Sequence, residues 1–268
     1  MDIIEIIGYV GALFVGLVLG LIGGGGSILT VPILVYALSF NPVIATAYSL
    51  FVVGTTSLIG ALKNMMKGKV AFKTAIIFAI PAFSAVFITR AYIIPAVPDK
   101  LFEIGGYMVT KNVAIMIFFA LIMLLASVTM ISNSRHKLES EKNNEKSNYP
   151  LLIGQGFLIG LVTGMVGAGG GFLIIPALVL LAKLPMKKAV ATSLFIIAIN
   201  SLIGFLGDVQ NYDIDWTFLL IFTAISTVGI FIGIWLNNFI DGKKLKKGFG
   251  WFVLVMGIYI IYKEIAKP

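Results

Sequence analysis

Long apolar runs separated by short polar connections dominate the sequence. Runs of about 18 to 25 residues, long enough as helices to cross about 30 Å of hydrocarbon, extend from Phe72 to Ile94, from Val109 to Ile131 and from Trp216 to Phe239. Hydrophobic residues make up 59% of the chain and charged residues only 12%, whereas about a quarter of the residues in soluble domains are charged. The pattern predicts an all-α polytopic membrane protein.

The second half of the sequence repeats the first. A shift that places Gly16 on Gly160 aligns GLVLGLIGGGGSILTVPILV with GLVTGMVGAGGGFLIIPALV without a gap. About 20 of roughly 45 positions are identical in this register, including glycines, a proline and serines that chance similarity between apolar segments would not align. We therefore expect an internal duplication, with a transmembrane repeat in residues 1–131, a polar cytoplasmic linker in 132–149 and a second repeat in 150–268.

Equivalent connections in the two repeats carry opposite charge. KNMMKGKVAFK, after the third hydrophobic segment of the first repeat, contains four lysines, whereas its counterpart GDVQNYDIDW contains three aspartates. Likewise, the uncharged SFNPV corresponds to the basic KLPMKK. Basic loops stay on the cytoplasmic side of a membrane, so equivalent connections should lie on opposite sides. The two repeats are therefore predicted to be inverted.

Inversion requires an odd number of crossings in each repeat, which five hydrophobic segments satisfy. The second segment of each repeat has about 12 residues, measures only about 18 Å as a helix and would not span the core alone. It could be a half-helix or part of a re-entrant hairpin, which leaves ten or eight crossings open. Ten crossings place both termini outside, although Lys263 and Lys267 fit an outside C-terminus poorly. The expected segments are 4–22, 27–39, 43–62, 72–94 and 107–131, then 150–168, 171–182, 186–206, 216–239 and 249–263.

A run of small residues precedes the short segment of each repeat, GGGGS at 23–27 and GAGGG at 167–171. Glycine weakens a helix, and the unpaired N–H groups at the start of the helix that follows favour an anion. Inverted repeats with glycine-interrupted short segments at matching positions are typical of a secondary transporter with its site at the repeat interface. We expect the two helix N-termini to form one anion cradle, with close helix packing as the alternative role of the glycines.

Hydroxyl and amide side chains recur at apolar depth in the third segment of each repeat and could hold an oxyanion without charge. No Asp or Glu is expected at membrane depth in the repeats, which favours an anion over a cation. Since Ser and Thr often bond back to their own helix, duplication singles out Ser49 with Ser193 and Ser57 with Ser201. The predicted substrate-binding residues are Gly24, Gly25, Gly26, Ser27, Ser49, Ser57, Gly169, Gly170, Gly171, Ser193, Asn200 and Ser201.

Other ionisable residues are assigned structural roles. Arg90 is expected to extend to the membrane interface, with a gating or substrate role as the alternative, and His136 lies in the polar linker. The chain has no cysteine, and no membrane-embedded histidine, aspartate pair or nucleophile elbow indicates an intramembrane enzyme. We therefore expect no catalytic residues, metal ligands or cofactors. The net charge of +8 suits anionic membrane lipid better than nucleic acid as a partner.

The motifs GLIGGGGSILTVP and GMVGAGGGFLIIP, each near the start of its repeat and followed by an alanine- and serine-rich segment, resemble those of the TauE/SafE sulfite exporter family of membrane permeases. The resemblance covers nearly the whole chain. It implies transport of small sulfur-containing anions, such as sulfite, thiosulfate or sulfonates like sulfoacetate, and a bacterial inner membrane as location. Within that family the substrate varies, so the resemblance does not specify which anion is carried.

The membrane potential suggests a direction of transport. A potential of about 100 mV, negative inside, favours export of each negative charge by about 2.3 kcal/mol. We therefore expect an electrogenic or weakly coupled exporter that works by alternating access. Transport of another anion, of a cation or metal, and a non-transporting membrane scaffold are the alternatives, and the oligomeric state stays open.

Overall fold

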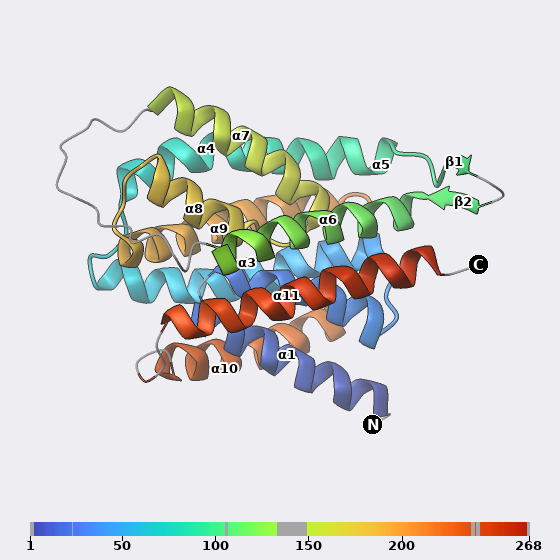
Figure 1. The fold of residues 1–268 in the computed structure, drawn as a ribbon, viewed down its shortest axis with the longest axis horizontal. Coiled ribbons are helices and arrows are strands. Elements are labelled where there is room, and N and C mark those ends of the chain that lie inside the picture. Colours follow the sequence, from blue (N-terminus) through green and yellow to red (C-terminus); the bar gives the residue numbers. More distant parts are fainter. Residues whose placement is uncertain are drawn as a thin grey trace.

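The computed structural model describes residues 3–22, 24–104, 107–132, 149–236, 239 and 242–266. Helices form nearly all of this part of the chain (Figure 1). Within it, six helices are long and apolar enough to cross a membrane, which confirms an all-α multi-pass membrane protein. The predicted linker, with His136, lies outside the described residues apart from its two ends.

The elements follow the predicted segments closely, with one addition. The first half comprises α1 (Ile3–Ile22), the 3₁₀ turn η1 (Gly24–Leu29), α2 (Thr30–Pro32), the π-helical η2 (Ile33–Ala37), α3 (Pro42–Met66), α4 (Phe72–Ile88), the π-helical η3 (Thr89–Ile93), α5 (Ile94–Ala96) and α6 (Lys111–Ser132). The second half comprises α7 (Tyr149–Val166), α8 (Gly171–Leu180), α9 (Met186–Val209), α10 (Trp216–Leu236) and α11 (Gly242–Ile265). An antiparallel pair of strands, β1 (Lys100–Ile104) and β2 (Tyr107–Thr110), stands where a helix was predicted from residue 107.

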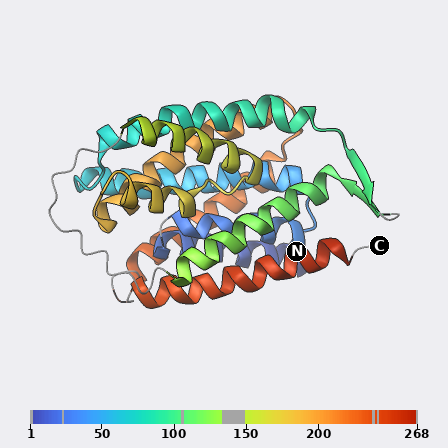
Figure 2. The same cartoon turned by 45° about the horizontal axis from the view of Figure 1, so that its top comes forward.

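The first glycine run lies at a reversal of the chain inside the bundle. α1 enters from the end that holds both termini, and the short elements return to that end, where α3 begins (Figures 1 and 2). The two limbs touch along their length: a Cβ built on Gly8 would lie 2.6 Å from Leu38 Cδ2, and one on Gly11 would lie 2.7 Å from Ile33 Cγ2. We call residues 3–37 the first hairpin.

Residues 149–180 form a second hairpin that enters from the opposite end of the bundle, with α7 inward and α8 outward (Figure 1). Both limbs of each hairpin therefore start and finish at one end. The expected ten or eight crossings are wrong for this reason, because six spanning helices and two re-entrant hairpins account for the described chain. Three crossings in each half still satisfy the odd number that inversion requires.

Packing between the halves is reciprocal. α1 packs along α10 and α7 along α4, while α3 crosses α9 and α6 packs along α11. Gly60 approaches Leu194 to 3.3 Å, and Gly204 approaches Leu50 to 3.3 Å, measured from a Cβ built on each glycine. The shift that aligns the two halves converts the first of these pairs into the second. Such reciprocity is what a twofold relation between the halves requires, and it supports the prediction of inverted repeats.

Glycines also permit the close helix pairs. A Cβ on Gly16 would collide with the backbone of Ser226 on α10, and one on Gly160 would collide with the backbone of Ala82 on α4. Small residues at this spacing let membrane helices approach closely enough for backbone contact. These glycines outside the two runs therefore serve packing.

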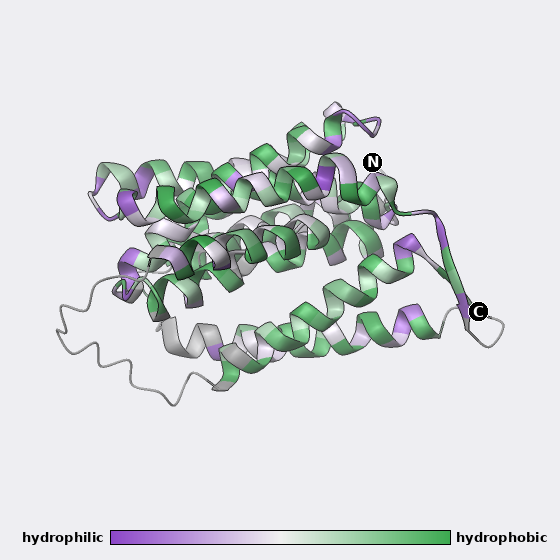
Figure 3. Ribbon diagram, turned by 90° about the horizontal axis from the view of Figure 1, so that it is seen from above, coloured by the Kyte–Doolittle hydropathy of each residue, from purple (hydrophilic) through white to green (hydrophobic). Residues whose placement is uncertain are grey.

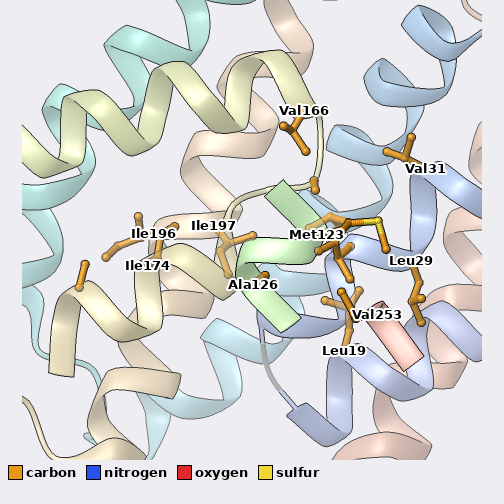
Figure 4. Packing of buried hydrophobic residues seen from close by; sticks show 14 of the residues in the cluster. Leu19, Leu29, Val31, Met123, Ala126, Val166, Ile174, Ile196, Ile197 and Val253 are labelled. Carbon is orange, nitrogen blue, oxygen red and sulfur yellow. The ribbon is translucent and has the colours of Figure 1, made fainter. Parts of the chain in front are cut away.

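The core lies where the tips of the two hairpins meet α6, α9 and α11 (Figure 4). Leu19 and Leu29 of the first hairpin, Ile174 of the second and Ile197 of α9 are at most 2% exposed. Hydrophilic residues gather towards the ends of the bundle, and the middle is mostly apolar (Figure 3). The apolar belt encloses the glycine turns.

Contacts with aromatic rings explain the position of Lys263 near the C-terminus. Lys263 Nζ lies 4.4 Å from the centroid of the Tyr36 ring, and the Tyr36 hydroxyl donates to Glu264 Oε1 at 2.9 Å. The cation–π contact holds this positive charge against the first hairpin. This local contact accounts for Lys263, so the lysine is weak evidence against a C-terminus on the outside.

Labelling of single cysteines tests the inverted topology, because the natural chain has none. Lys69 and Asp213 occupy equivalent exposed positions in the two repeats. In Lys69→Cys the new thiol should react with a membrane-impermeant maleimide only from the cytoplasmic side, and in Asp213→Cys only from the outside. Labelling of both positions from the same side would contradict inversion.

Candidate functional site

The second glycine turn is inserted between α3 and α9. Gly167, Gly169 and Gly170 have φ values of +69°, +63° and +72°, in the left-handed region that residues with a Cβ rarely adopt. A Cβ on Gly169 would lie 2.7 Å from Val53 Cγ1 and 2.9 Å from Ser201 Oγ. Both the backbone conformation and the lack of space therefore require glycine at position 169.

Helix α8 starts at Gly171, as the sequence predicts, with Gly170 as its N-cap. Leu173 and Ile174 both donate to the Gly170 carbonyl, at 2.9 and 3.0 Å. The earlier N–H groups of a helix have no partner within it, and the helix dipole is positive at this end. The turn therefore offers backbone donors to an anion at the centre of the bundle.

The first hairpin differs from this expectation. Its helical part begins at Gly24 as a 3₁₀ turn, before the predicted start at Ser27, and α-helical hydrogen bonding begins at Thr30. Ser27 is buried, whereas the surroundings of Gly24, Gly25 and Gly26 lie outside what the structure describes. The predicted cradle of two equivalent helix N-termini stays a prediction on this side.

Buried polar atoms without partners line α3 and α9. Ser49, Ser57, Asn200 and Ser201 are at most 1% exposed. Within the described part of the chain, no hydrogen-bond partner reaches the three hydroxyls or either amide atom of Asn200. Native proteins pair nearly all such atoms, and each unpaired one costs about 1–3 kcal/mol. A ligand or ordered water is needed to satisfy them.

Ser193 is the exception among the predicted third-segment residues. Its Oγ donates to the Val190 carbonyl of its own helix at 2.9 Å. Back-bonding of this kind is the common structural role of serine in a helix. Nothing in its contacts indicates a binding role.

The predicted residues form a row along the α3–α9 interface instead of one cradle. α3 and α9 are antiparallel, because Gly54 packs on Leu202 and Gly60 on Leu194. This register places Ser57 and Ser201 within about one helical turn in depth, whereas Ser49 lies about 12 Å from Ser57 along α3. The structure brings Gly169 and Ser201 into contact, but Ser49 and Ser57 are too far apart to hold the same small anion.

Arg90 lies in the interior and not at the membrane interface, so the expectation of an extended side chain is wrong. It is 0% exposed. Its Nη1 donates to Thr46 Oγ1 at 2.9 Å and lies 3.4 Å from Asp208 Oδ2. Arg90 belongs to the π-helical turn η3, and such turns inside helices occur frequently at functional sites.

The position of Asp208 also differs from the sequence prediction. α9 continues to Val209, so Asp208 lies in its last turn and is 0% exposed, although the sequence placed it in an acidic loop. A carboxylate is therefore buried within a spanning helix, where none was expected. Burial of an isolated charge is very unfavourable, and Arg90 supplies the opposite charge that makes it tolerable.

Neither member of this pair has an ionisable counterpart in the other repeat. Arg90 corresponds to Ile234, and Asp208 corresponds to Asn64. The predicted binding residues were chosen because they recur in both repeats, so neither Arg90 nor Asp208 was among them. The signal available in the sequence was a single arginine within an apolar segment together with an aspartate directly after another.

The comparisons with known proteins identify the family. The family model described as "Sulfite exporter TauE/SafE" matches residues 9–260. The chain belongs to the TauE/SafE family. No solved structure matches it.

Relatives of this TauE/SafE chain are named as transporters. A probable membrane transporter protein of Xylella fastidiosa is 29% identical over 257 residues, which cover 94% of this chain and 93% of the relative. The probable membrane transporter protein YunE of Bacillus subtilis is 28% identical over 268 residues, with 94% and 96% covered. The protein MJ0441 of Methanocaldococcus jannaschii, of the same description, is 39% identical over 117 residues, with 41% and 44% covered. The chain is a membrane transporter, and these names specify no substrate.

A substitution at the glycine turn tests its structural requirement. Gly169→Ala should lower the free energy of unfolding by at least about 1–3 kcal/mol, the cost of a non-glycine residue in a left-handed conformation, because its Cβ also crowds Val53. Thermal unfolding of the purified protein in detergent measures this loss.

Gly154→Ala on α7 is the matched control, since a Cβ there meets nothing within 4 Å. In a helix this change should leave stability unchanged or raise it by up to about 1 kcal/mol. Equal unfolding temperatures for the two variants would show that the turn does not require glycine.

Proposed function

We propose that this TauE/SafE protein transports small sulfur-containing anions, such as sulfite or a sulfonate like sulfoacetate, and holds the anion where the glycine turns meet α3 and α9. The observation that carries the proposal is the set of buried, unpaired donors on α3 and α9, of which Ser201 contacts the second turn. Among the described residues, Ser57 Oγ, Ser201 Oγ and Asn200 Nδ2 have no partner. An SO₃ group accepts hydrogen bonds at three oxygens and would satisfy hydroxyl, amide and backbone donors together.

The chemistry of these groups favours an anion over a cation. Hydroxyls can donate, the amide nitrogen only donates, and the start of α8 presents N–H groups and the positive end of a dipole. Asp208, in the last turn of α9, faces Arg90. The pair adds no net charge, so the buried carboxylate does not turn the site into one for cations.

The two hairpins supply a route for alternating access. The row of polar groups is enclosed in this conformation, so an anion enters or leaves only when the packing around it opens. The hairpins enter from opposite ends and touch where η1 meets α8. Withdrawal of the first hairpin would open the site towards the end with the termini, and withdrawal of the second would open it towards the other end.

The membrane potential then sets the preferred direction. An anion that crosses without a coupling ion leaves a cell with a negative interior, because each charge gains about 2.3 kcal/mol per 100 mV. Neutralisation of Asp208 by Arg90 keeps the empty protein free of a net charge at this point. Export remains the direction that this proposal expects.

Flux into proteoliposomes tests the proposed function. Labelled sulfite and sulfoacetate should enter under a potassium–valinomycin potential that is positive inside, and flux should fall when the potential is reversed. The double variant Ser57→Ala/Ser201→Ala should lose at least about tenfold in flux, since hydrogen bonds to a charged ligand contribute about 1.5–3 kcal/mol each.

Ser84→Ala on α4 is the control, because that hydroxyl donates to Ile80 of its own helix and lies outside the proposed site. It should transport as the natural chain does. Absence of flux with sulfite, sulfoacetate and thiosulfate in the natural chain would refute the proposed substrate class, and flux that ignores the potential would refute electrogenic transport.

A further inference from the structure

Arg90 has more hydrogen-bonding capacity than its surroundings use. A guanidinium carries five N–H donors. Within the described chain, Nη1 bonds Thr46 and faces Asp208, whereas Nε and Nη2 have no partner. Complete burial of these two nitrogens requires an acceptor that the described residues do not provide.

The N···O distances between Arg90 and Asp208 are also longer than those of a well-formed ion pair. Nη1 lies 3.4 Å from Oδ2 and 3.5 Å from Oδ1, whereas charge-assisted hydrogen bonds are about 2.7–2.9 Å long. One nitrogen faces both oxygens, so the parallel two-bond pairing that arginine and carboxylate favour is not formed. Asp208 neutralises Arg90 without satisfying it.

The unused edge of Arg90 faces the second glycine turn. A Cβ on Gly167 would lie 2.7 Å from Arg90 Nη2 and would collide with Thr46. Two residues further on, Gly169 contacts Ser201. The same short turn therefore touches Arg90 on one side and the unpaired hydroxyl of Ser201 on the other.

Tyr212 adds a further donor near the pair. In the described structure its hydroxyl is buried without a partner. Burial raises the pKa of this hydroxyl, and the Asp208 carboxylate raises it further. Tyr212 therefore remains protonated and able to donate a hydrogen bond.

We propose that Arg90 binds the negative charge of the transported anion, and that Asp208 is an internal counter-ion which the anion displaces. This inference rests on the proposed function and names a charge-recognising residue at the same glycine turn, on its Gly167 side. Two oxygens of an SO₃ group match the spacing of guanidinium N–H donors. The third oxygen is left for N–H donors of the glycine turn.

The exchange of partners accounts for both halves of a transport cycle. With an anion bound, Arg90 is paired with substrate and Asp208 turns to other donors such as Tyr212. After release, Asp208 pairs with Arg90 again, so the protein returns without an unpaired buried charge, which would oppose the return. Asp208 thus competes with the substrate and limits its affinity.

Four variants separate this role from that of a structural ion pair: Arg90→Gln, Asp208→Asn, the double variant and Arg90→Lys. Each is purified, checked by thermal unfolding and assayed for the concentration dependence of sulfite and sulfoacetate flux. Asp208→Asn should still transport, with KM lowered at least threefold because the competing carboxylate is gone. Both variants with Arg90→Gln should lose saturable flux at least 100-fold, although the double variant carries no unpaired charge.

A structural pair predicts the reverse pattern. The double variant would then transport at least as well as either single variant, and Asp208→Asn would be as inactive as Arg90→Gln. Either result overturns the inference. Arg90→Lys keeps the charge and loses the fork, so its KM should rise at least tenfold. If the Arg90→Gln variants do not fold, an unchanged KM in Arg90→Lys overturns the inference.

Transport by the natural chain distinguishes a failure of the proposed function from a failure of the role inferred for Arg90. If it transports a sulfur oxyanion and the double variant does so equally well, Arg90 is not the anion-binding residue and the proposed function stands. If the natural chain transports none of the sulfur oxyanions, the proposed function fails and the inference fails with it.

Discussion

The fold depends on a chain reversal at glycines inside a membrane bundle. Hydrocarbon offers no partner for free N–H and C=O groups, so non-helical backbone is tolerated only where protein or a polar cavity surrounds it. The turn at 167–170 meets this condition because α3, η3 and α9 cover it, with Thr46, Val53 and Ser201 in contact with its glycines. Three left-handed glycines within four residues let the chain reverse in a space that admits no side chain. The N–H groups at the start of α8 are then available at the centre of the bundle.

Reciprocal packing makes the two halves dependent on each other. The first helix of each half packs along the fourth hydrophobic segment of the other half: α1 along α10, and α7 along α4. Glycine-to-backbone contacts hold these pairs, as is common where helices associate without a hydrophobic driving force. The second glycine turn contacts Thr46 and Val53 of the other half as well as Ser201 of its own half, so these groups come together only when the halves are combined. A site at the interface follows from this arrangement.

Much of the fold could be predicted from the sequence because the relevant signals are local. Hydropathy indicates the spanning helices, and the fixed register between Gly16 and Gly160 reveals the duplication. The start of α8 at Gly171 follows from the end of the glycine run. The path of each hairpin could not be predicted, since segment length alone does not show to which end of the bundle a limb returns. The strands before α6 were not predicted either, because residues 107–110 continue the apolar run of that helix.

The sequence predicted only those site residues that a local, duplicated pattern marks. Ser57 and Ser201 recur in both repeats and remain buried without partners, whereas Ser193 recurs and bonds to its own helix. Arg90 and Asp208 lie far apart in the sequence, and each occurs in one repeat only. Their contact arises from the crossing of η3 with α9, which no local pattern encodes. Arg90 and Asp208 differ from their counterparts in the other repeat, and both lie in apolar surroundings. In the sequence, that difference is the signal for these two residues.

The most direct test of an anion site at the second glycine turn is a diffraction measurement at the selenium edge on crystals grown with selenite, a heavier analogue of sulfite. The account predicts an anomalous peak within contact distance of the turn at 167–170, on its Arg90 side or its Ser201 side, and loss of that peak when excess sulfite competes. A peak found only at the surface of the bundle, or one that sulfite does not displace, would contradict an anion site at this turn.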